Sequence, residues 1–143
     1  MALQIEYSHV INRPIDVVFR FMVVEHVENH PRWDSDIELW LDSDDPIGVG
    51  TIIRRRNSRS GTPVEGTMEV TEYETNRKFT TLIQDGPATM IGGLSFEQAG
   101  DNKTKVTMVI DLPDMDESMD TSFLMQRLEE VAKIREELIE AEV

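Results

Sequence analysis

The order of the elements along this chain constrains its fold more than any single motif does. Sequence periodicity predicts a strand at 3–11, a proline-started amphipathic helix at 14–23 and a second helical turn at 25–30. Pro31 is expected to end that turn, because the residue before a proline is pushed away from helical geometry. A run of alternating strands and one acidic helix complete the chain. This order predicts an α+β fold in which a sheet packs on a long C-terminal helix.

The central strands share an apolar face. Alternate side chains of a strand point to the same side of a sheet, and the segments 64–74, 89–98 and 103–112 follow this alternation. Turn residues separate the strands, so the spacing is that of an antiparallel meander. The side chains expected on the inward face are Val64, Gly66, Met68, Val70, Met90, Gly92, Leu94, Phe96, Val106, Met108, Ile110 and Leu112.

Composition excludes several classes of function. The length of 143 residues and the absence of a linker predict a single domain over 1–143. The net charge of −14 disfavours nucleic acid and anionic membranes as partners. No apolar run is long enough to span a membrane. The first residues lack the pattern of a secretory signal, so we expect a cytoplasmic location.

Three short motifs raise the question of a metal or a nucleotide. His26 and His30 have the i, i+4 spacing of two ligands, but no third ligand accompanies them and the chain has no cysteine. Gly48 and Gly50 lack the third glycine and the following helix of a dinucleotide site. The acidic stretch 111–120 lacks the central glycine of a calcium loop. We therefore expect no metal and no cofactor.

Several stretches resemble one known family. They are Asn-Arg-Pro-Ile-Asp-Val-Val-Phe-Arg-Phe at 12–21, Asn-His-Pro-Arg-Trp at 29–33, Gly-Val-Gly-Thr at 48–51, the segment 66–79 and Phe96-Glu97 before Gly100. Together they resemble the polyketide cyclase/dehydrase-like branch of the START-like (SRPBCC) superfamily. The resemblance implies a helix-grip fold, in which a curved antiparallel sheet wraps around a long C-terminal helix, with two short helices after the first strand. It also implies a ligand cavity between sheet and helix.

Combining the inward pattern with this resemblance gives a set of candidate ligand-binding residues. Methionine is unbranched and polarisable, so it suits an adaptable apolar cavity, although it also simply fills cores. Leu124 and Leu128 lie on the apolar stripe of the last helix, and Trp33 follows the expected turn. The candidates are Trp33, Arg54, Met68, Met90, Phe96, Met108, Leu124 and Leu128.

The arginines of the strand at 51–57 divide between its two faces. Arg55 shares a face with Ile53, whereas Arg54 and Arg56 share the other, and Arg59 follows in the next turn. We expect Arg54 to be the inward member. A buried guanidinium needs an acidic companion or an anionic ligand. The alternative is a charged strand that only discourages edge pairing.

These observations favour binding or transport of an apolar or amphipathic small molecule, lipid-like or polyketide-like, in the cavity. The alternative is a polyketide cyclase, aromatase or dehydratase that uses the same cavity without a metal. An enzyme needs a proton-moving group on the inward face, and the meander strands carry no histidine. Trp40, expected on the outer face, marks a candidate contact for a homodimer.

Overall fold

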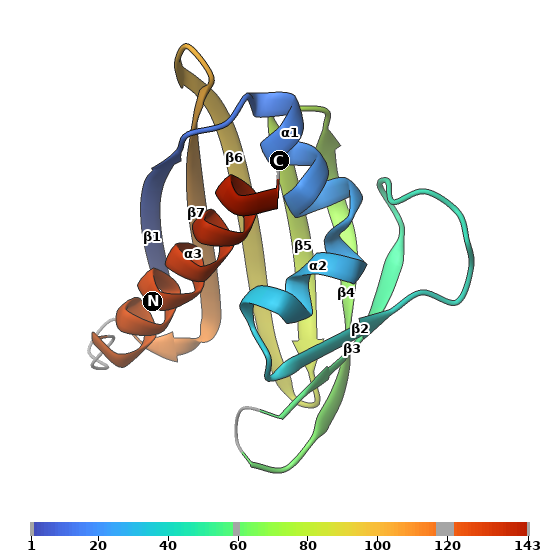
Figure 1. The fold of residues 1–143 in the computed structure, drawn as a ribbon. Coiled ribbons are helices and arrows are strands. Elements are labelled where there is room, and N and C mark those ends of the chain that lie inside the picture. The colour runs from blue at the N-terminus through green and yellow to red at the C-terminus, as the bar shows by residue number, and fades with distance from the viewer. Residues whose placement is uncertain (1, 59–60, 117–121, 143) are drawn as a thin grey trace.

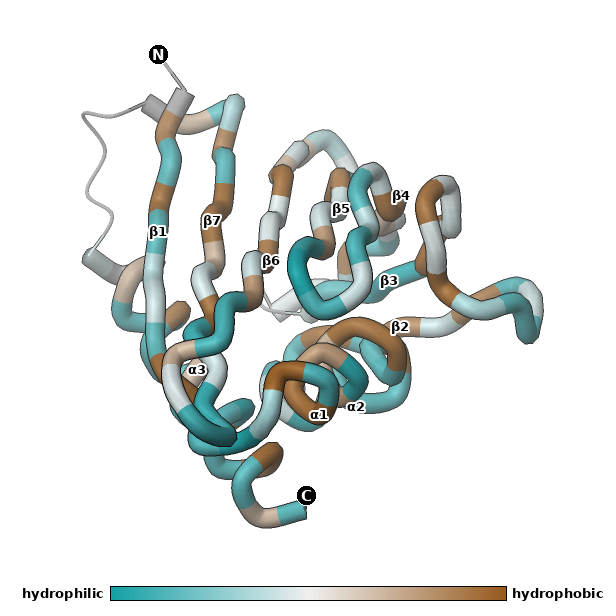
Figure 2. The backbone as a smooth tube through the Cα atoms, turned by 90° about the horizontal axis from the view of Figure 1, so that it is seen from above, coloured by the Kyte–Doolittle hydropathy of each residue, from teal (hydrophilic) through white to brown (hydrophobic). Residues whose placement is uncertain are grey.

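The strands form one curved antiparallel sheet in the order β1-β7-β6-β5-β4-β3-β2. This computed structural model describes residues 2–58, 61–116 and 122–142. All helices lie against the same face of the sheet (Figures 1 and 2), which is the helix-grip arrangement expected from the sequence. The strands are β1 (Ala2–Ile11), β2 (Ile37–Trp40), β3 (Ile52–Asn57), β4 (Val64–Glu74), β5 (Lys78–Asp85), β6 (Ala88–Gly100) and β7 (Lys103–Asp116).

The first helical segment differs from the expected continuous helix at 14–23. An α-helix, α1 (Ile15–Phe19), passes into a π-helical turn, η1 (Arg20–Val24). The N–H of Glu25 donates to the carbonyl of Arg20, five residues back, at 2.9 Å. The wider turn buries three consecutive apolar residues, Phe21, Met22 and Val23, which a regular α-helix would spread around its surface.

The second helix, α2 (His26–Trp33), continues through Pro31, so the prediction that Pro31 ends it is wrong. Proline removes one N–H donor but leaves the following donors intact. The N–H of Asp34 still donates to the carbonyl of His30 at 3.0 Å. The extra residues carry Trp33 into the interior, where it is 3% exposed.

The long C-terminal helix, α3 (Ser122–Glu142), crosses the sheet and contributes to two hydrophobic clusters, Ile139 to the larger and Leu128 to the smaller. The larger cluster lies under α1 and η1, where Phe19 packs edge-on against Phe96 with ring centroids 5.1 Å apart. The smaller cluster joins Leu3 and Ile5 of β1, Leu112 of β7 and Leu128 of α3. The space between α3 and the middle of the sheet holds the candidate site.

Candidate ligand-binding cavity

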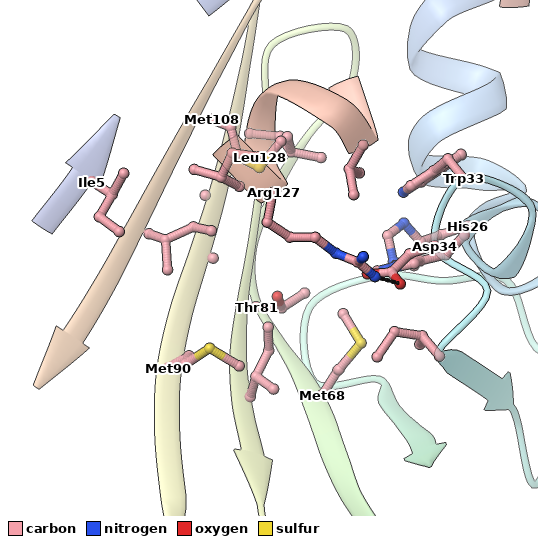
Figure 3. Close-up of a pocket in the computed structure, with 18 of the residues that line it drawn as sticks. Ile5, His26, Trp33, Asp34, Met68, Thr81, Met90, Met108, Arg127 and Leu128 are labelled. Carbon is pink, nitrogen blue, oxygen red and sulfur yellow. Dashed lines mark hydrogen bonds and ion pairs between the residues drawn. The ribbon is translucent and has the colours of Figure 1, made fainter. Parts of the chain in front are cut away.

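A cavity of about 190 Å³ lies between the sheet, α2 and α3. Register explains why its sheet wall is apolar, because residues paired on neighbouring antiparallel strands share a face. Met68, Ile83 and Met90 are paired in one row across β4, β5 and β6. Thr81, Gly92, Ile110 and Ile5 make the adjacent row. Figure 3 shows side chains from sheet and helices converging on this space.

Most of the candidate ligand-binding residues border this cavity. They are Trp33, Met68, Met90, Met108, Leu124 and Leu128. Phe96 does not border it, although the prediction of its inward face is correct. Its ring packs in the larger cluster against Phe19 of α1, which fills the space on that side.

The prediction that Arg54 faces the cavity is wrong. Its side chain is 54% exposed, and its Nε donates to Asp42 at 2.8 Å. The inward arginine is Arg55, which is 3% exposed. Arg55 Nε and Nη2 donate to the two carboxylate oxygens of Asp85 at 2.7 and 2.8 Å. The expected acidic companion is therefore present, on β5. Arg59 lies outside the described residues.

A second cavity-lining arginine, Arg127 of α3, ties the two helical walls together. Its Nη2 lies 2.8 Å from Asp34 Oδ1 and 2.8 Å from Asp36 Oδ2 (Figure 3 draws the contact with Asp34). Asp34 follows α2 directly and is itself 6% exposed. Two carboxylates thus neutralise one guanidinium at this edge of the cavity.

The third arginine, Arg135 of α3, differs from the other two. It borders the cavity and is 2% exposed, yet no carboxylate among the described residues pairs with it. Its Nη2 lies 3.2 Å from His9 Nε2, and its Cζ lies 5.5 Å from the Trp33 ring centroid. Its buried Nε, like that of Arg127, makes no hydrogen bond in the described structure. Burial lowers the pKa of Arg135 to about 10, so the group remains charged at neutral pH.

His26 and His30 form a hydrogen-bonded pair on the cavity wall. His26 Nδ1 lies 2.7 Å from the carbonyl of Met22, which can only accept, so Nδ1 carries the proton. Because His26 is neutral, its Nε2 accepts from His30 Nδ1 at 2.9 Å. Burial, with the positive charges of Arg135 and Arg55, lowers the pKa of His26 to about 4, against the hydrogen bond to Met22.

Metal binding finds no support in the described part of the chain. There, His, Asp and Glu side chains do not gather in groups of three or more with the spacing of a metal site. The paired nitrogens of His26 and His30 point at each other rather than at a shared point. Of the acidic stretch 111–120, residues 117–120 lie outside the described residues.

Sequence reasoning missed Arg127, Arg135 and the companions Asp34 and Asp85. For Arg135 a signal was present, because it follows Leu128 by two helical turns and so lies on the apolar stripe of α3. A charged residue on such a stripe is expected to be buried. For Asp85 no local signal exists, since its position at the end of β5 resembles that of an ordinary turn residue.

The fold and cavity together define a helix-grip domain with an internal, mostly apolar chamber. No protein-family model matches the sequence, and no curated protein matches it either. Solved structures do match: Ara h 8.0201 has a TM-score of 0.77 at 14% identity, covering 99% of both chains. The ginseng major latex-like protein 151 from Panax ginseng has a TM-score of 0.75 at 16% identity, covering 94% of this chain and 95% of that one.

A START superfamily protein from Mycobacterium smegmatis is also similar, with a TM-score of 0.74 at 16% identity over 98% of this chain and 99% of that one. These likenesses show the fold: the chain has the same helix-grip fold as these proteins, as the resemblance of its sequence implied. Within the described ranges, the structure contains no helix that is both long and apolar enough to cross a membrane.

Proposed function

We propose that this protein binds or carries an apolar or amphipathic small molecule, lipid-like or polyketide-like, in the cavity under α3. The observation that carries the proposal is the cavity itself, about 190 Å³ of space bordered mainly by methionine, leucine and isoleucine side chains. Close packing is the rule in protein interiors, so a chamber of this size between packed elements is a binding site by default.

The wall chemistry supports an adaptable site. Met68 and Met90 face the space from β4 and β6, and Met108 from β7 (Figure 3). Unbranched thioether side chains follow the shape of different apolar ligands at low energetic cost. Trp33 adds a flat aromatic surface beside them. Ligand contact by these residues, and by Leu124 and Leu128, is part of the proposal.

A second candidate function, a cyclase, aromatase or dehydratase acting on a polyketide-like chain, rests on one observation. His26 and His30 border the cavity, so the site has the proton-carrying groups that the meander strands lack. Both ring nitrogens of His26 and Nδ1 of His30 are engaged in hydrogen bonds, which favours the binding function. This enzymatic function is tested by incubating the protein with a linear poly-β-ketone and following the formation of aromatic product by ultraviolet absorbance. Product that forms with the parent protein but not with His26→Gln would favour the enzyme.

Adjacent glycines on β6 provide a matched test of the cavity. A Cβ added at Gly92 would lie 3.6 Å from the cavity-lining side chains of Thr81 and Ile83. A Cβ at Gly93 would instead meet Val109 and Thr80 at 3.7 and 3.8 Å. Both contacts are ordinary van der Waals distances, and valine suits a strand. Gly92→Val therefore fills the cavity. The backbone of Gly93 also borders the cavity, but Gly93→Val adds the same side chain on the opposite face of the sheet.

The probe is N-phenyl-1-naphthylamine, a neutral fluorophore whose emission rises in apolar sites. We expect saturable binding to the parent protein, affinity at least about tenfold weaker for Gly92→Val, and unchanged affinity for Gly93→Val. Absence of saturable binding to the parent, or equal losses in both variants, would refute the proposal. Where the expected binding is found, native mass spectrometry of protein from its own organism would identify the class of the retained ligand.

The same proposal treats residues 1–143 as one domain that acts in the cytoplasm without nucleic acid. The absence of cysteine and the net charge of −14 support this view. We also propose a homodimer contact at Trp40, where the ring lies 5.7 Å from the Arg56 guanidinium on the outer side of β2. Analytical ultracentrifugation of the parent and of Trp40→Ala tests the contact.

A further inference from the structure

The cavity contains one buried positive charge that the described protein residues leave unpaired. Arg55 is held by both oxygens of Asp85, and Arg127 is held by Asp34 and Asp36. Arg135, buried to the same degree as Arg55, has no carboxylate partner among the described residues. A guanidinium removed from water without a counter-ion is strongly unfavourable. A fold that keeps such a group at its ligand cavity points to a counter-ion that arrives with the ligand.

The surroundings of Arg135 do not offset its charge. The polar groups that interact with it in the described structure are His9, His26 and Tyr7, none of which is a carboxylate, and burial together with Arg135 lowers the pKa of each imidazole to about 4. Both rings are therefore neutral at physiological pH. Trp33 faces the guanidinium as an aromatic surface, which attracts a cation but carries no net charge.

The charges elsewhere on the cavity wall determine which end of the cavity favours a negatively charged group of the ligand. Asp34 and Asp36 place two carboxylates against Arg127. They disfavour an anion at that edge of the cavity and leave Arg135 as the position where a negative group is stabilised. Since only one cation is uncompensated among the described cavity residues, a group with a single negative charge fits best.

We propose that the natural ligand is an amphipathic monocarboxylic acid whose carboxylate pairs with Arg135. This inference rests on the proposed function and specifies its ligand class. The planar guanidinium matches a carboxylate in a two-pronged, charge-assisted contact. The apolar part of the ligand lies along the stripe of α3 that continues through Val131, Leu128 and Leu124. Eleven residues separate Leu124 from Arg135, about 16 Å of helix, which leaves room for a medium-length chain.

Matched acid and ester probes test this assignment. Decanoic acid and methyl decanoate are compared at pH 7.5 by their displacement of N-phenyl-1-naphthylamine. The variants are Arg135→Met, which removes the charge, and Arg135→Lys, which keeps it. Arg32→Met serves as the control, because Arg32 pairs with Glu142 outside the cavity and its replacement changes the net charge equally. We expect Arg135→Met to fold, because it removes a buried charge that no described carboxylate neutralises.

We expect the parent protein to prefer the acid over the ester by about tenfold or more, the range of one charge-assisted contact. In Arg135→Met this preference should be lost, because the affinity for the acid falls while the affinity for the ester does not change. Arg135→Lys should keep part of the preference, and Arg32→Met should keep all of it. Equal affinities for acid and ester in the parent, or equal losses of both in Arg135→Met, would overturn the inference while leaving the proposed function standing. Failure of the fluorophore and of both probes to bind would instead refute the proposed function.

Discussion

Arg55 and Asp85 meet across Gly66. In the register of the sheet, Gly66 of β4 is paired with Arg55 of β3 on one side and with Asp85 of β5 on the other. The two charged side chains close over the glycine with contacts of 2.7 and 2.8 Å. Asn57 donates to the same carboxylate at 3.0 Å. A buried ion pair at the end of the cavity thus depends on a residue without a side chain.

Replacing Asp85 by alanine should strongly destabilise the protein. Arg55 would remain buried without its partner, and breaking a buried pair in this way costs roughly 3–5 kcal/mol. Urea unfolding monitored by circular dichroism measures the change. Arg54→Ala is the matched control on the same strand; because the Arg54 side chain is 54% exposed, its loss of stability should be far smaller than that of Asp85→Ala. A similar loss in both variants would contradict the assignment of Arg55 as the buried member.

Gly66→Ala should be nearly as damaging as loss of the ion pair. An added Cβ would lie 1.9 Å from the carbonyl oxygen of Gln84 and 2.7 Å from Asp85 Oδ1. Since the first of these is backbone, the strands must separate, and we expect a loss of about 3 kcal/mol or more in the free energy of unfolding, measured by the same urea titration.

Gly48→Ala is the comparison for this change, because a Cβ added at Gly48 would have no atom within 4 Å among the described residues. It should alter stability by less than about 1 kcal/mol. If Gly66→Ala proved equally mild, β4 and β5 would have to be farther apart at this point than the structure shows.

The faces of the strands could be predicted from the sequence because side-chain alternation has a fixed period. This period predicts that Met68, Met90 and Met108 face inward, and all three border the cavity. The same rule could not decide between Arg54 and Arg55, because alternation defines two faces without saying which is buried. That choice depends on Asp85, which is distant in sequence and meets Arg55 only through the register of three strands.

The limits of the cavity could not be predicted for a related reason. Phe96 has the correct face, but whether an inward side chain meets a ligand or a helix depends on where α1 lies. The position of Arg135 was readable from the period of α3, although its lack of a carboxylate partner among the described residues is a property of the folded neighbourhood.

Stability should fall between pH 7 and pH 4 because of His26. Its ordinary pKa of 6.5 applies in the unfolded chain, whereas burial lowers the pKa to about 4 in the folded protein. Between these values the unfolded state binds more protons, so acid favours unfolding, and above pH 7 the effect vanishes. Through His26 alone, the free energy of unfolding should be roughly 2 kcal/mol lower at pH 5 than at pH 8.

Urea unfolding at pH 8, 6 and 5 checks this dependence. His26→Phe should flatten the pH profile relative to the parent, whatever its own stability. A residual slope is expected, because the pKa of His9 is also lowered to about 4, by burial and then by Arg135. An unchanged profile in His26→Phe would show that folding does not lower the pKa of His26.

Arg135→Met should raise the pKa values of both His9 and His26. The positive charge of Arg135 lowers both, so its removal leaves burial as the main remaining cause and keeps the values below 6.5. Two-dimensional NMR of the imidazole Cε1–H signals, followed through an acid titration, measures the two values directly without any ligand.

The ligand-free variant should also be as stable as the parent within about 1 kcal/mol, or more stable, because an unpaired buried charge has been removed. In Arg32→Met the histidine titrations should be unchanged. Histidine pKa values that stay the same in Arg135→Met, together with a large loss of stability, would show that Arg135 is a neutralised structural residue and not an open position for a carboxylate.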